Sequence, residues 1–341
     1  MRQAYHLTLS HKKHSLWLVF FGSVCLLGVL SFLSLRLGAK GITSQRFWHA
    51  LFSVANKTPE SLFIWEIRLP RLLTAIIVGA SLAQSGLIMQ TLTQNDLADP
   101  SLLGVNAGSG LALVIGLLLF PGASYSMRFA LCFIGAGLAA TMIFGLMTKN
   151  HDHRNGARLI VSGMLITLFC QALGQGIGLI SHTTSHIIGW QAGSLSQLSW
   201  AGLSLILPFI LIGTGLLLLL APPLSLFALG EMRSYHLGVR VTMVKGLGFV
   251  SVLFLAASST ALCGLITFIG LIAPNMAATI VPRHRFIPLA AMTSLIGAIG
   301  LVLADLISRT VFAPSELPVN LIMSLIGIPF FIWTIRQGGE L

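Results

Sequence analysis

The chain has 341 residues, of which 55% are hydrophobic and only 9% are charged, and its mean hydropathy is +0.90. Soluble domains carry about 25% charged residues, so this composition excludes an ordinary soluble protein and indicates a polytopic membrane protein. The net charge of +11 does not indicate nucleic-acid binding, because the basic residues are scattered in short segments between apolar blocks. Such scattering is typical of loops that orient membrane helices.

The first apolar segment covers residues 16–35 and follows Lys12 and Lys13, which gives it the look of a signal peptide. Its length of about 20 residues exceeds the roughly 7–15 of a signal core, so we expect it to remain as the first transmembrane helix. Residues 36–66 are more polar and contain Trp48 and Trp65, which favours a segment lying at the membrane surface.

The remaining apolar blocks predict further helices at residues 72–91, 105–119, 127–148, 159–180, 203–220, 246–262, 275–281, 289–307 and 320–335. The expected fold class is an all-α membrane protein of about ten transmembrane helices, with residues 1–341 forming a single domain. Ten crossings put both termini on one side of the membrane. Counting Lys and Arg in the loops gives that side, taken as cytoplasmic, a modest majority of the 20 basic residues.

Residues 222–245 read PPLSLFALGEMRSYHLGVRVTMVK and separate two long apolar blocks. The segment is too polar to remain in lipid. Pro222 and Pro223 are expected to stop the preceding helix, and Gly230 and Gly238 are expected to form turns. Apolar residues at roughly helical spacing predict two short helices on the membrane surface. The alternative is a solvated loop.

Two other stretches are irregular. Residues 95–104 contain two acids and a proline, and residues 264–274 are interrupted by glycine and proline. Irregular backbone at membrane depth must be surrounded by protein. Small residues spaced four apart, such as Ser81 and Ser85 or Gly104 and Gly108, predict close helix packing.

We expect no metal site and no cofactor. The cysteines at 25, 132, 170 and 263 stand singly in apolar blocks and are interpreted as small buried hydrophobic residues. His151 and His153 lie in a basic loop, and His182 and His186 lack a third ligand, so a solvated loop is favoured over a metal site. No P-loop motif occurs, so a partner must hydrolyse any ATP.

A series of motifs between residues 67 and 338 resembles the FecCD family, the permease subunits of ABC importers for iron-siderophores, haem and vitamin B12. These motifs are Arg68-Leu69-Pro70-Arg71, Leu97-Ala98-Asp99-Pro100, Leu229-Gly230-Glu231 with Leu237-Gly238-Val239, Gly264-x-Ile266-x-Phe268-Ile269-Gly270, Glu316-Leu317-Pro318-Val319 and Gly327-x-Pro329-Phe330.

The resemblance implies a permease subunit that imports an iron-siderophore or related iron chelate and is not itself an enzyme; haem and vitamin B12 are alternatives. It implies three partners: an ATPase dimer, a second permease subunit and an extracytoplasmic binding protein. It also implies a location in the bacterial cytoplasmic membrane, with both termini cytoplasmic.

The alternative functions are an ion-coupled secondary transporter and an intramembrane enzyme. The first needs an unpaired buried carboxylate, and Asp305 has Arg309 four residues away. The second needs clustered His, Asp or Glu residues, which are not visible.

The resemblance also assigns site residues. Coupling to the ATPase is expected at Leu229, Gly230, Glu231, Tyr235, Leu237 and Gly238. Docking of the binding protein is expected at outward-facing Arg68, Arg71 and Arg309. The translocation path or gate is expected at Gln90, Asn95, Asp99, Gly264, Phe268, Gly270 and Pro274.

Five positions depart from the family pattern: Asp96, Ser234, Asn275, Ala278 and Asn320. Such departures are easier to tolerate when a second, different permease subunit keeps the usual residues. We therefore favour a heterodimer of non-identical permeases, with a homodimer as the alternative.

Overall fold

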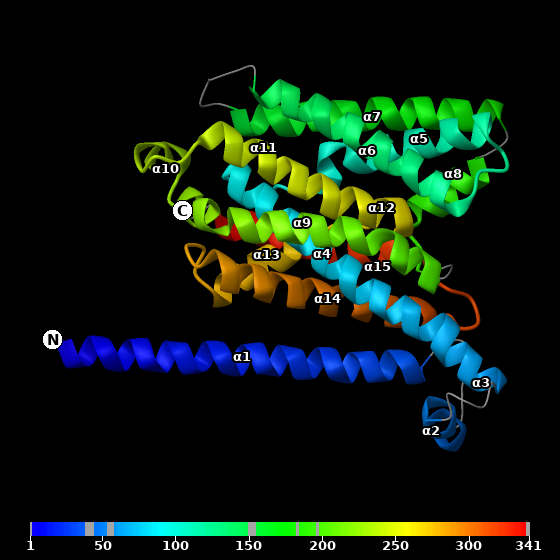
Figure 1. Cartoon of the computed structure of the whole chain (residues 1–341), viewed down its shortest axis with the longest axis horizontal. Helices are drawn as coiled ribbons and strands as arrows, with labels where there is room; N and C mark the ends of the chain where they lie inside the picture. Colours follow the sequence, from blue (N-terminus) through cyan, green and yellow to red (C-terminus); the bar gives the residue numbers. More distant parts are fainter. Residues whose placement is uncertain are drawn as a thin grey trace.

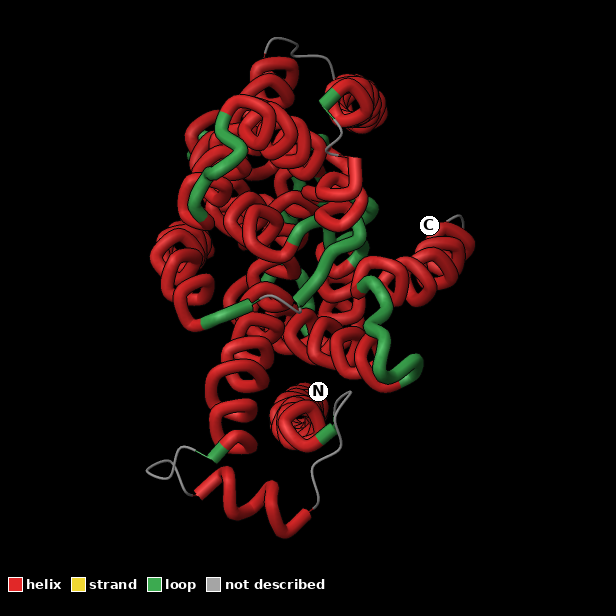
Figure 2. The backbone as a smooth tube through the Cα atoms, turned by 90° about the vertical axis from the view of Figure 1, so that its right-hand side faces the viewer, coloured by secondary structure: helices red, strands yellow, loops and turns green. Residues whose placement is uncertain are grey.

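The architecture is taken from a computed structural model, which describes residues 2–37, 44–52, 58–148, 155–181, 184–195 and 198–338. All regular structure within these ranges is helical, as Figure 2 shows, and no strand occurs among them. The predicted all-α fold class is confirmed.

The helices follow one another along the chain with short connections. They are α1 (Arg2–Arg36), α2 (Ser44–Phe52), α3 (Pro59–Leu62), the π-helical turn η1 (Phe63–Arg68), α4 (Leu69–Thr93), the 3-10 turn η2 (Pro100–Leu103), α5 (Val105–Leu119), α6 (Tyr125–Thr148), α7 (Asn155–Ile180), α8 (Thr184–Gln191), α9 (Trp200–Phe227), α10 (Glu231–His236), α11 (Val241–Val252), the π-helical turn η3 (Leu253–Ala257), α12 (Ser258–Cys263), α13 (Ile269–Ile280), α14 (Phe286–Thr310) and α15 (Val319–Gly338).

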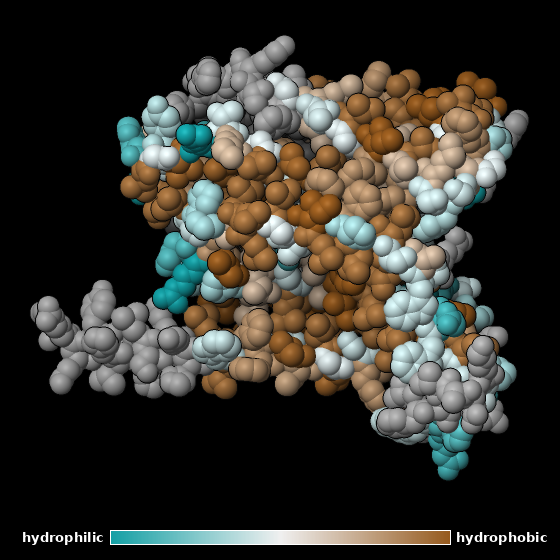
Figure 3. Space-filling model, in the orientation of Figure 1, coloured by the Kyte–Doolittle hydropathy of each residue, from teal (hydrophilic) through white to brown (hydrophobic). Residues whose placement is uncertain are grey.

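Within the described residues, seven helical segments are long and apolar enough to cross a membrane, and three shorter apolar helices accompany them. The long helices run side by side in Figure 1, and Figure 3 shows an apolar band flanked by hydrophilic ends. The start of α1 and the end of α15 lie at the end of the bundle where α10 projects (Figure 1). This arrangement agrees with about ten crossings.

Helix α4 forms the centre of the core, where it packs against α9, α11, α13 and α14. Its approach to α13 and α14 is so close that a Cβ on Gly86 would overlap the carbonyl of Gly270, and one on Gly79 would overlap that of Gly297. Ser81 Oγ lies 2.7 Å from Ser259 Oγ on α12. The predicted close packing at small residues is therefore found on this helix.

The second transmembrane helix begins earlier than predicted. Instead of starting at residue 72, it is continuous over Pro59–Thr93 and includes part of the stretch expected on the membrane surface. Pro70 is tolerated inside it because the π turn shifts the bonding, with the amide of Leu69 donating to Ile64 O. Pro70 has no amide hydrogen to donate to the carbonyl of Trp65, five residues before it. The indole of Trp200 donates to Trp65 O instead (3.0 Å).

The prediction that Pro222 and Pro223 stop a helix is wrong. Helix α9 continues through both prolines to Phe227, so one short helix, α10, follows it instead of two. An interior proline costs about 3 kcal/mol, and here complete burial of Leu224 and Phe227 in the core offsets that cost. The turns predicted at Gly230 and Gly238 are confirmed by φ values of +107° and +83°.

The eighth transmembrane helix also begins earlier than predicted, at Ile269 instead of residue 275, so Pro274 lies inside α13. Proline has no amide hydrogen for the carbonyl of Gly270, four residues before it. Gln90 on α4 supplies the missing donor, because its Nε2 lies 3.3 Å from Gly270 O and 3.4 Å from Leu271 O. A buried side chain of the neighbouring helix thus stabilises the proline-containing turn.

Candidate functional site

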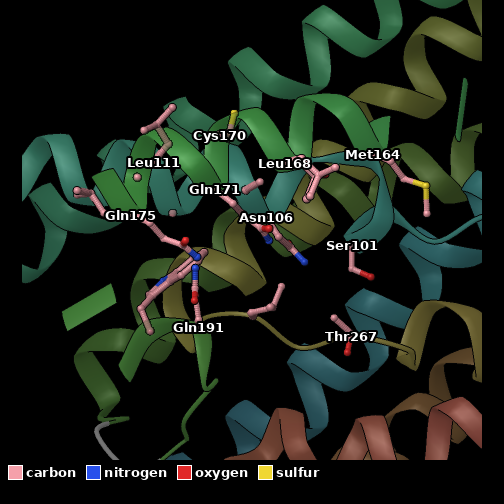
Figure 4. Close-up of a pocket in the computed structure, with 17 residues that line it drawn as sticks. Ser101, Asn106, Leu111, Met164, Leu168, Cys170, Gln171, Gln175, Gln191 and Thr267 are labelled. Atoms are coloured by element: carbon pink, nitrogen blue, oxygen red, sulfur yellow. The ribbon is translucent and has the colours of Figure 1, made fainter. Parts of the chain in front are cut away.

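A cavity of about 360 Å³ lies between α5, α7, α8 and the non-helical residues between α12 and α13 (Figure 4). Its wall combines neutral polar side chains with aliphatic and small ones. The lining residues are Ser101, Asn106, Ala107, Gly110, Leu111, Val114, Met164, Thr167, Leu168, Cys170, Gln171, Gly174, Gln175, Trp190, Gln191, Leu265 and Thr267.

The seven residues predicted for the translocation path do not line this cavity. Gln90, Gly270 and Pro274 form the packed contact between α4 and α13 described above. They therefore serve the packing of these two helices in this structure. Their direct contact with a transported ligand remains a prediction.

Gly264 and Phe268 border the non-helical stretch, and both have left-handed backbone conformations, with φ of +74° and +68°. The amide of Leu265 donates to Trp190 O (3.3 Å), and the amide of Ser194 donates to Cys263 O (3.0 Å). These bonds attach the break to the segment after α8. The stretch between Gly264 and Phe268 contributes two of the cavity residues.

Asn95 and Asp99 shape the turn between α4 and α5. Asn95 Oδ1 accepts from the amide of Leu97 (2.9 Å), and Asp99 Oδ1 accepts from that of Ser101 (2.7 Å). Burial raises the pKa of the Asp99 carboxyl, and the hydrogen bonds from Ser101 oppose that rise. Asp99 thus lies directly behind the cavity wall, since Ser101 is part of that wall.

The sequence analysis missed most of the polar residues that line the cavity, namely Asn106, Thr167, Gln171, Gln175, Gln191 and Thr267. Gln171 and Gln175 could have been found, because amides four residues apart in an apolar helix share one face. Thr267 could not, because it is held by a distant residue: both its amide (3.1 Å) and its hydroxyl (2.8 Å) donate to Asn320 Oδ1.

The expected coupling segment projects at the end of the bundle as α10 and its flanking turns (Figure 1). Its apolar side chains are not covered by the chain: Tyr235 is 66% exposed and Leu237 60%. Glu231 pairs with Lys245 (2.6 Å) at the start of the next helix. Ser234 is fully buried, and its hydroxyl contacts the carbonyls of Leu226 and Gly230 (both 2.8 Å). This departure from the family pattern thus stabilises the turn.

The three arginines expected to dock the binding protein lie close to one another, but their side chains are buried instead of facing outward. Arg71 donates to Asp305 (2.8 Å) and makes a two-pronged contact with Glu316 (2.9 and 3.1 Å). Arg309 lies 3.2 Å from the second oxygen of Asp305. The predicted pair of Asp305 and Arg309 is therefore present and is enlarged by Arg71.

The same arginines fasten the end of α1. Arg68 donates to Leu35 O (2.5 Å) and Arg36 O (2.9 Å), carbonyls of the last turn of that helix. Arg309 also contacts the Ser34 hydroxyl. Positive groups at a helix C-terminus satisfy its unpaired carbonyls and its dipole. The arginines are buried because they also bind the C-terminal end of α1, a contact that the linear sequence does not reveal.

Three further departures from the family pattern take part in contacts between elements. Arg283 pairs with Asp96 (2.9 Å), and the Asn275 amide donates to Asp96 O (2.9 Å). Arg283 also reaches Asn275 Oδ1 (3.3 Å). Asp96 and Asn275 thus belong to one contact between the turn after α4 and the end of α13, while Asn320 holds Thr267.

The residues considered as metal ligands give no assembled site within the described chain, where no group of three His, Cys, Asp or Glu side chains converges. His151, Asp152, His153 and His182 lie outside the described residues, as does the side chain of His186. Of the four cysteines, Cys132 and Cys263 are buried as expected, Cys170 is half-buried and Cys25 is exposed.

Comparison with known proteins gives a consistent result. The sequence profile of the FecCD transport family matches residues 26–337. The chain is 37% identical over 334 residues to the hemin transport system permease protein HmuU of Yersinia pestis, covering 92% of this chain and 94% of that protein. It is 34% identical over 322 residues to the iron(3+)-hydroxamate import system permease protein FhuB of Bacillus subtilis (strain 168), covering 94% and 83%.

A solved structure of a metal-chelate type ABC transporter in an inward-facing conformation has the same fold. It superposes with a TM-score of 0.79 at 27% identity, over 94% of this chain and 99% of that chain.

Proposed function

Because this chain belongs to the FecCD transport family, we propose that it is the permease subunit of a binding-protein-dependent ABC importer for an iron-siderophore or related iron chelate. It is an integral membrane protein and not an enzyme, so ATP is hydrolysed by a separate ATPase dimer. Haem is the second candidate substrate, because the relative HmuU is named as a hemin permease.

The observation that carries this proposal is the part of the predicted coupling segment (residues 222–245) that projects from the bundle, residues 229–238. It places Leu229, Tyr235 and Leu237 at the projecting end of the bundle with their apolar side chains exposed. Exposed apolar side chains gathered on a short projecting helix are typical of a protein contact. The ATPase subunit is the partner we assign to this surface, and the cytoplasm is the compartment we assign to this end.

The opposite end of the bundle carries the buried arginines and Glu316, and we assign the binding protein to it. Within the described residues, this cluster has three guanidinium groups, those of Arg68, Arg71 and Arg309, and two carboxylates, those of Asp305 and Glu316. The excess of positive charge favours an acidic partner and would steer its approach. The second permease subunit is proposed to be a non-identical relative, with a second copy of this chain as the alternative.

An ion-coupled transporter is disfavoured by the surroundings of Asp305. Its carboxylate faces two guanidinium groups, those of Arg71 and Arg309, whereas a proton or sodium relay needs a carboxylate that can change its charge.

The test is uptake of radiolabelled iron by cells that lack their own iron-chelate permeases and express this chain with its ATPase, partner permease and binding protein. We expect uptake of at least one ferric chelate, and its loss when the P-loop lysine of the ATPase is replaced. Uptake that survives this replacement would contradict an ABC importer. Uptake of vitamin B12 alone would contradict the iron substrate.

A further inference from the structure

The cavity in Figure 4 is built without charge. Among its described lining residues there is no Lys, Arg, His, Asp or Glu. Its polar groups are amides, hydroxyls and one indole. Burying an ion without a counter-charge is far more costly than burying a neutral group that is hydrogen-bonded. A wall of this kind therefore favours an uncharged ligand over an anionic one.

The wall also holds hydrogen-bond donors that the described chain leaves unused. Trp190 Nε1 and Ser101 Oγ are buried and have no hydrogen-bond partner there. Asn106 Oδ1 already accepts from Thr260 (2.7 Å), which leaves the amide nitrogen of Asn106 as its free polar group. Buried donors without partners are rare in proteins. A ligand rich in carbonyl oxygens would satisfy them.

A buried carboxyl beside the wall adds to the discrimination. Asp99 accepts the amide hydrogen of Ser101, which lines the cavity. Whether ionised or neutral, this carboxyl offers no positive counter-charge to an anion in the cavity.

We propose that this cavity selects an uncharged iron chelate and binds one of its amide- or hydroxamate-bearing arms through carbonyl oxygens. Its volume of about 360 Å³ is near the lower limit of ligand pockets, which are about 300–1,000 Å³, and so it suits an arm better than a whole chelate. Asn320 is the positioning residue, because it takes both polar hydrogens of Thr267 and leaves that hydroxyl as an acceptor. The inference rests on the proposed function.

The experiment measures binding directly, using the permease assembled with its ATPase and partner permease in lipid nanodiscs, without nucleotide or binding protein. Two probes labelled with radioactive iron are compared by equilibrium dialysis: ferrichrome, an uncharged ferric trihydroxamate, and ferric enterobactin, which is multiply anionic. We expect ferrichrome to bind at least about tenfold more tightly, equivalent to about 1.4 kcal/mol.

Gln171→Arg places a positive charge in the cavity and should abolish or reverse this preference. The matched control is Gln45→Arg, which makes the same change at an exposed position of α2 and should leave the preference unaltered. If Gln171→Arg does not assemble, Gln191→Arg makes the same test. Ser101→Ala, which removes an unused donor, should weaken ferrichrome binding about threefold without improving ferric enterobactin binding.

Equal or tighter binding of ferric enterobactin by the unaltered complex would overturn the inference, as would an unchanged preference in Gln171→Arg. Either result, with ATP-dependent uptake of a ferric chelate intact, would leave the proposed function standing. Absence of uptake of any ferric chelate by the assembled importer would instead refute the proposed function.

Discussion

At the scale of single residues, Gln90 and Pro274 form a compensating pair. The proline interrupts α13 and frees the carbonyl of Gly270, and the glutamine on α4 donates to that carbonyl across the helix contact. An unsatisfied buried carbonyl costs about 1–3 kcal/mol, which makes the pair testable by a double-mutant cycle.

Gln90→Met should lower the thermal unfolding midpoint of the purified permease, because Gly270 O then has no side-chain donor. Pro274→Ala restores a backbone donor to that carbonyl, so the effect of Gln90→Met should be smaller in the Pro274→Ala background. We expect a coupling free energy of about 1 kcal/mol between the two changes. Strictly additive effects would show that the glutamine does not replace the missing amide hydrogen.

Glu316 offers a second test at this scale. Its side chain is one-third exposed and forms an ion pair with the guanidinium group of Arg71. An acidic binding protein would have to compete with it. Glu316→Gln should therefore tighten capture of the binding protein several-fold, measured by surface immobilisation at low salt. Arg68→Glu combined with Arg71→Glu should weaken capture and abolish its salt dependence.

The double replacement also breaks the attachment of α1, so its assembly with the ATPase must be measured in parallel. Arg128→Glu is the matched charge reversal, since the Arg128 side chain donates to the carbonyl of Ala123 at the start of α6 and contacts none of the cluster. Unchanged capture by a correctly assembled Arg68→Glu and Arg71→Glu protein would remove these arginines from the docking site.

At the scale of elements, the coupling segment is the clearest case of a short helix held at both ends by glycine. Gly230 and Gly238 adopt positive φ angles, and the Ser234 hydroxyl fastens the turn at Gly230 by donating to the carbonyls of Leu226 and Gly230. The apolar side chains are left exposed as a result, so their contribution to folding is small and their contribution to a protein contact can be large.

Leu237→Asp should leave the fold intact, because the side chain is exposed, but should bury an unpaired charge at the ATPase contact. We expect the binding protein still to dock, while transport and stimulated ATP hydrolysis fall at least about tenfold, equivalent to about 1.4 kcal/mol of coupling. The control is Thr242→Asp on α11, outside the projecting residues 229–238. Normal stimulated hydrolysis by a stably assembled Leu237→Asp protein would exclude this helix from coupling.

Element types were predictable from sequence, whereas several boundaries were not. Proline signals failed at Pro222, Pro223 and Pro274, where burial and the side-chain donor from Gln90 maintain the helix. The spacing of Gln171 and Gln175 could indicate one polar face of the cavity, but the complete wall was not predictable, because it joins residues from α5, α7, α8 and a distant break. The family motifs indicated residues near the cavity more readily than the residues that line it.

At the scale of the whole molecule, topology is the central question. The start of α1, the end of α15, α10 and the turn between α13 and α14 lie at one end of the bundle (Figure 1), and we assign that end to the cytoplasm. Single cysteines at Asn155, His236 and His284, in a background without native cysteines, should resist an impermeant thiol reagent in intact cells. His236 is used because its neighbour Ser234 is buried and would resist labelling on either side.

A cysteine at Phe312, exposed in the turn after α14, should by contrast be labelled from outside. Labelling at His236 with protection at Phe312 would invert the orientation and contradict both the docking and the coupling assignments.

The backbone contacts of α4 have a mechanical consequence. At Gly79 and Gly297, and at Gly86 and Gly270, the backbones of neighbouring helices come so close that an added Cβ would overlap a carbonyl oxygen, so α13 and α14 are packed tightly against α4. Gly108 and Gly135 lock α5 to α6 in the same way. The turn of residues 94–104 joins these two tightly packed groups of helices, and Gln94 and Gly104 adopt positive φ angles in it. In alternating access we expect each group to move as a unit, and the uncharged cavity is lined by residues of α5 in one group and of the stretch that leads into α13 in the other.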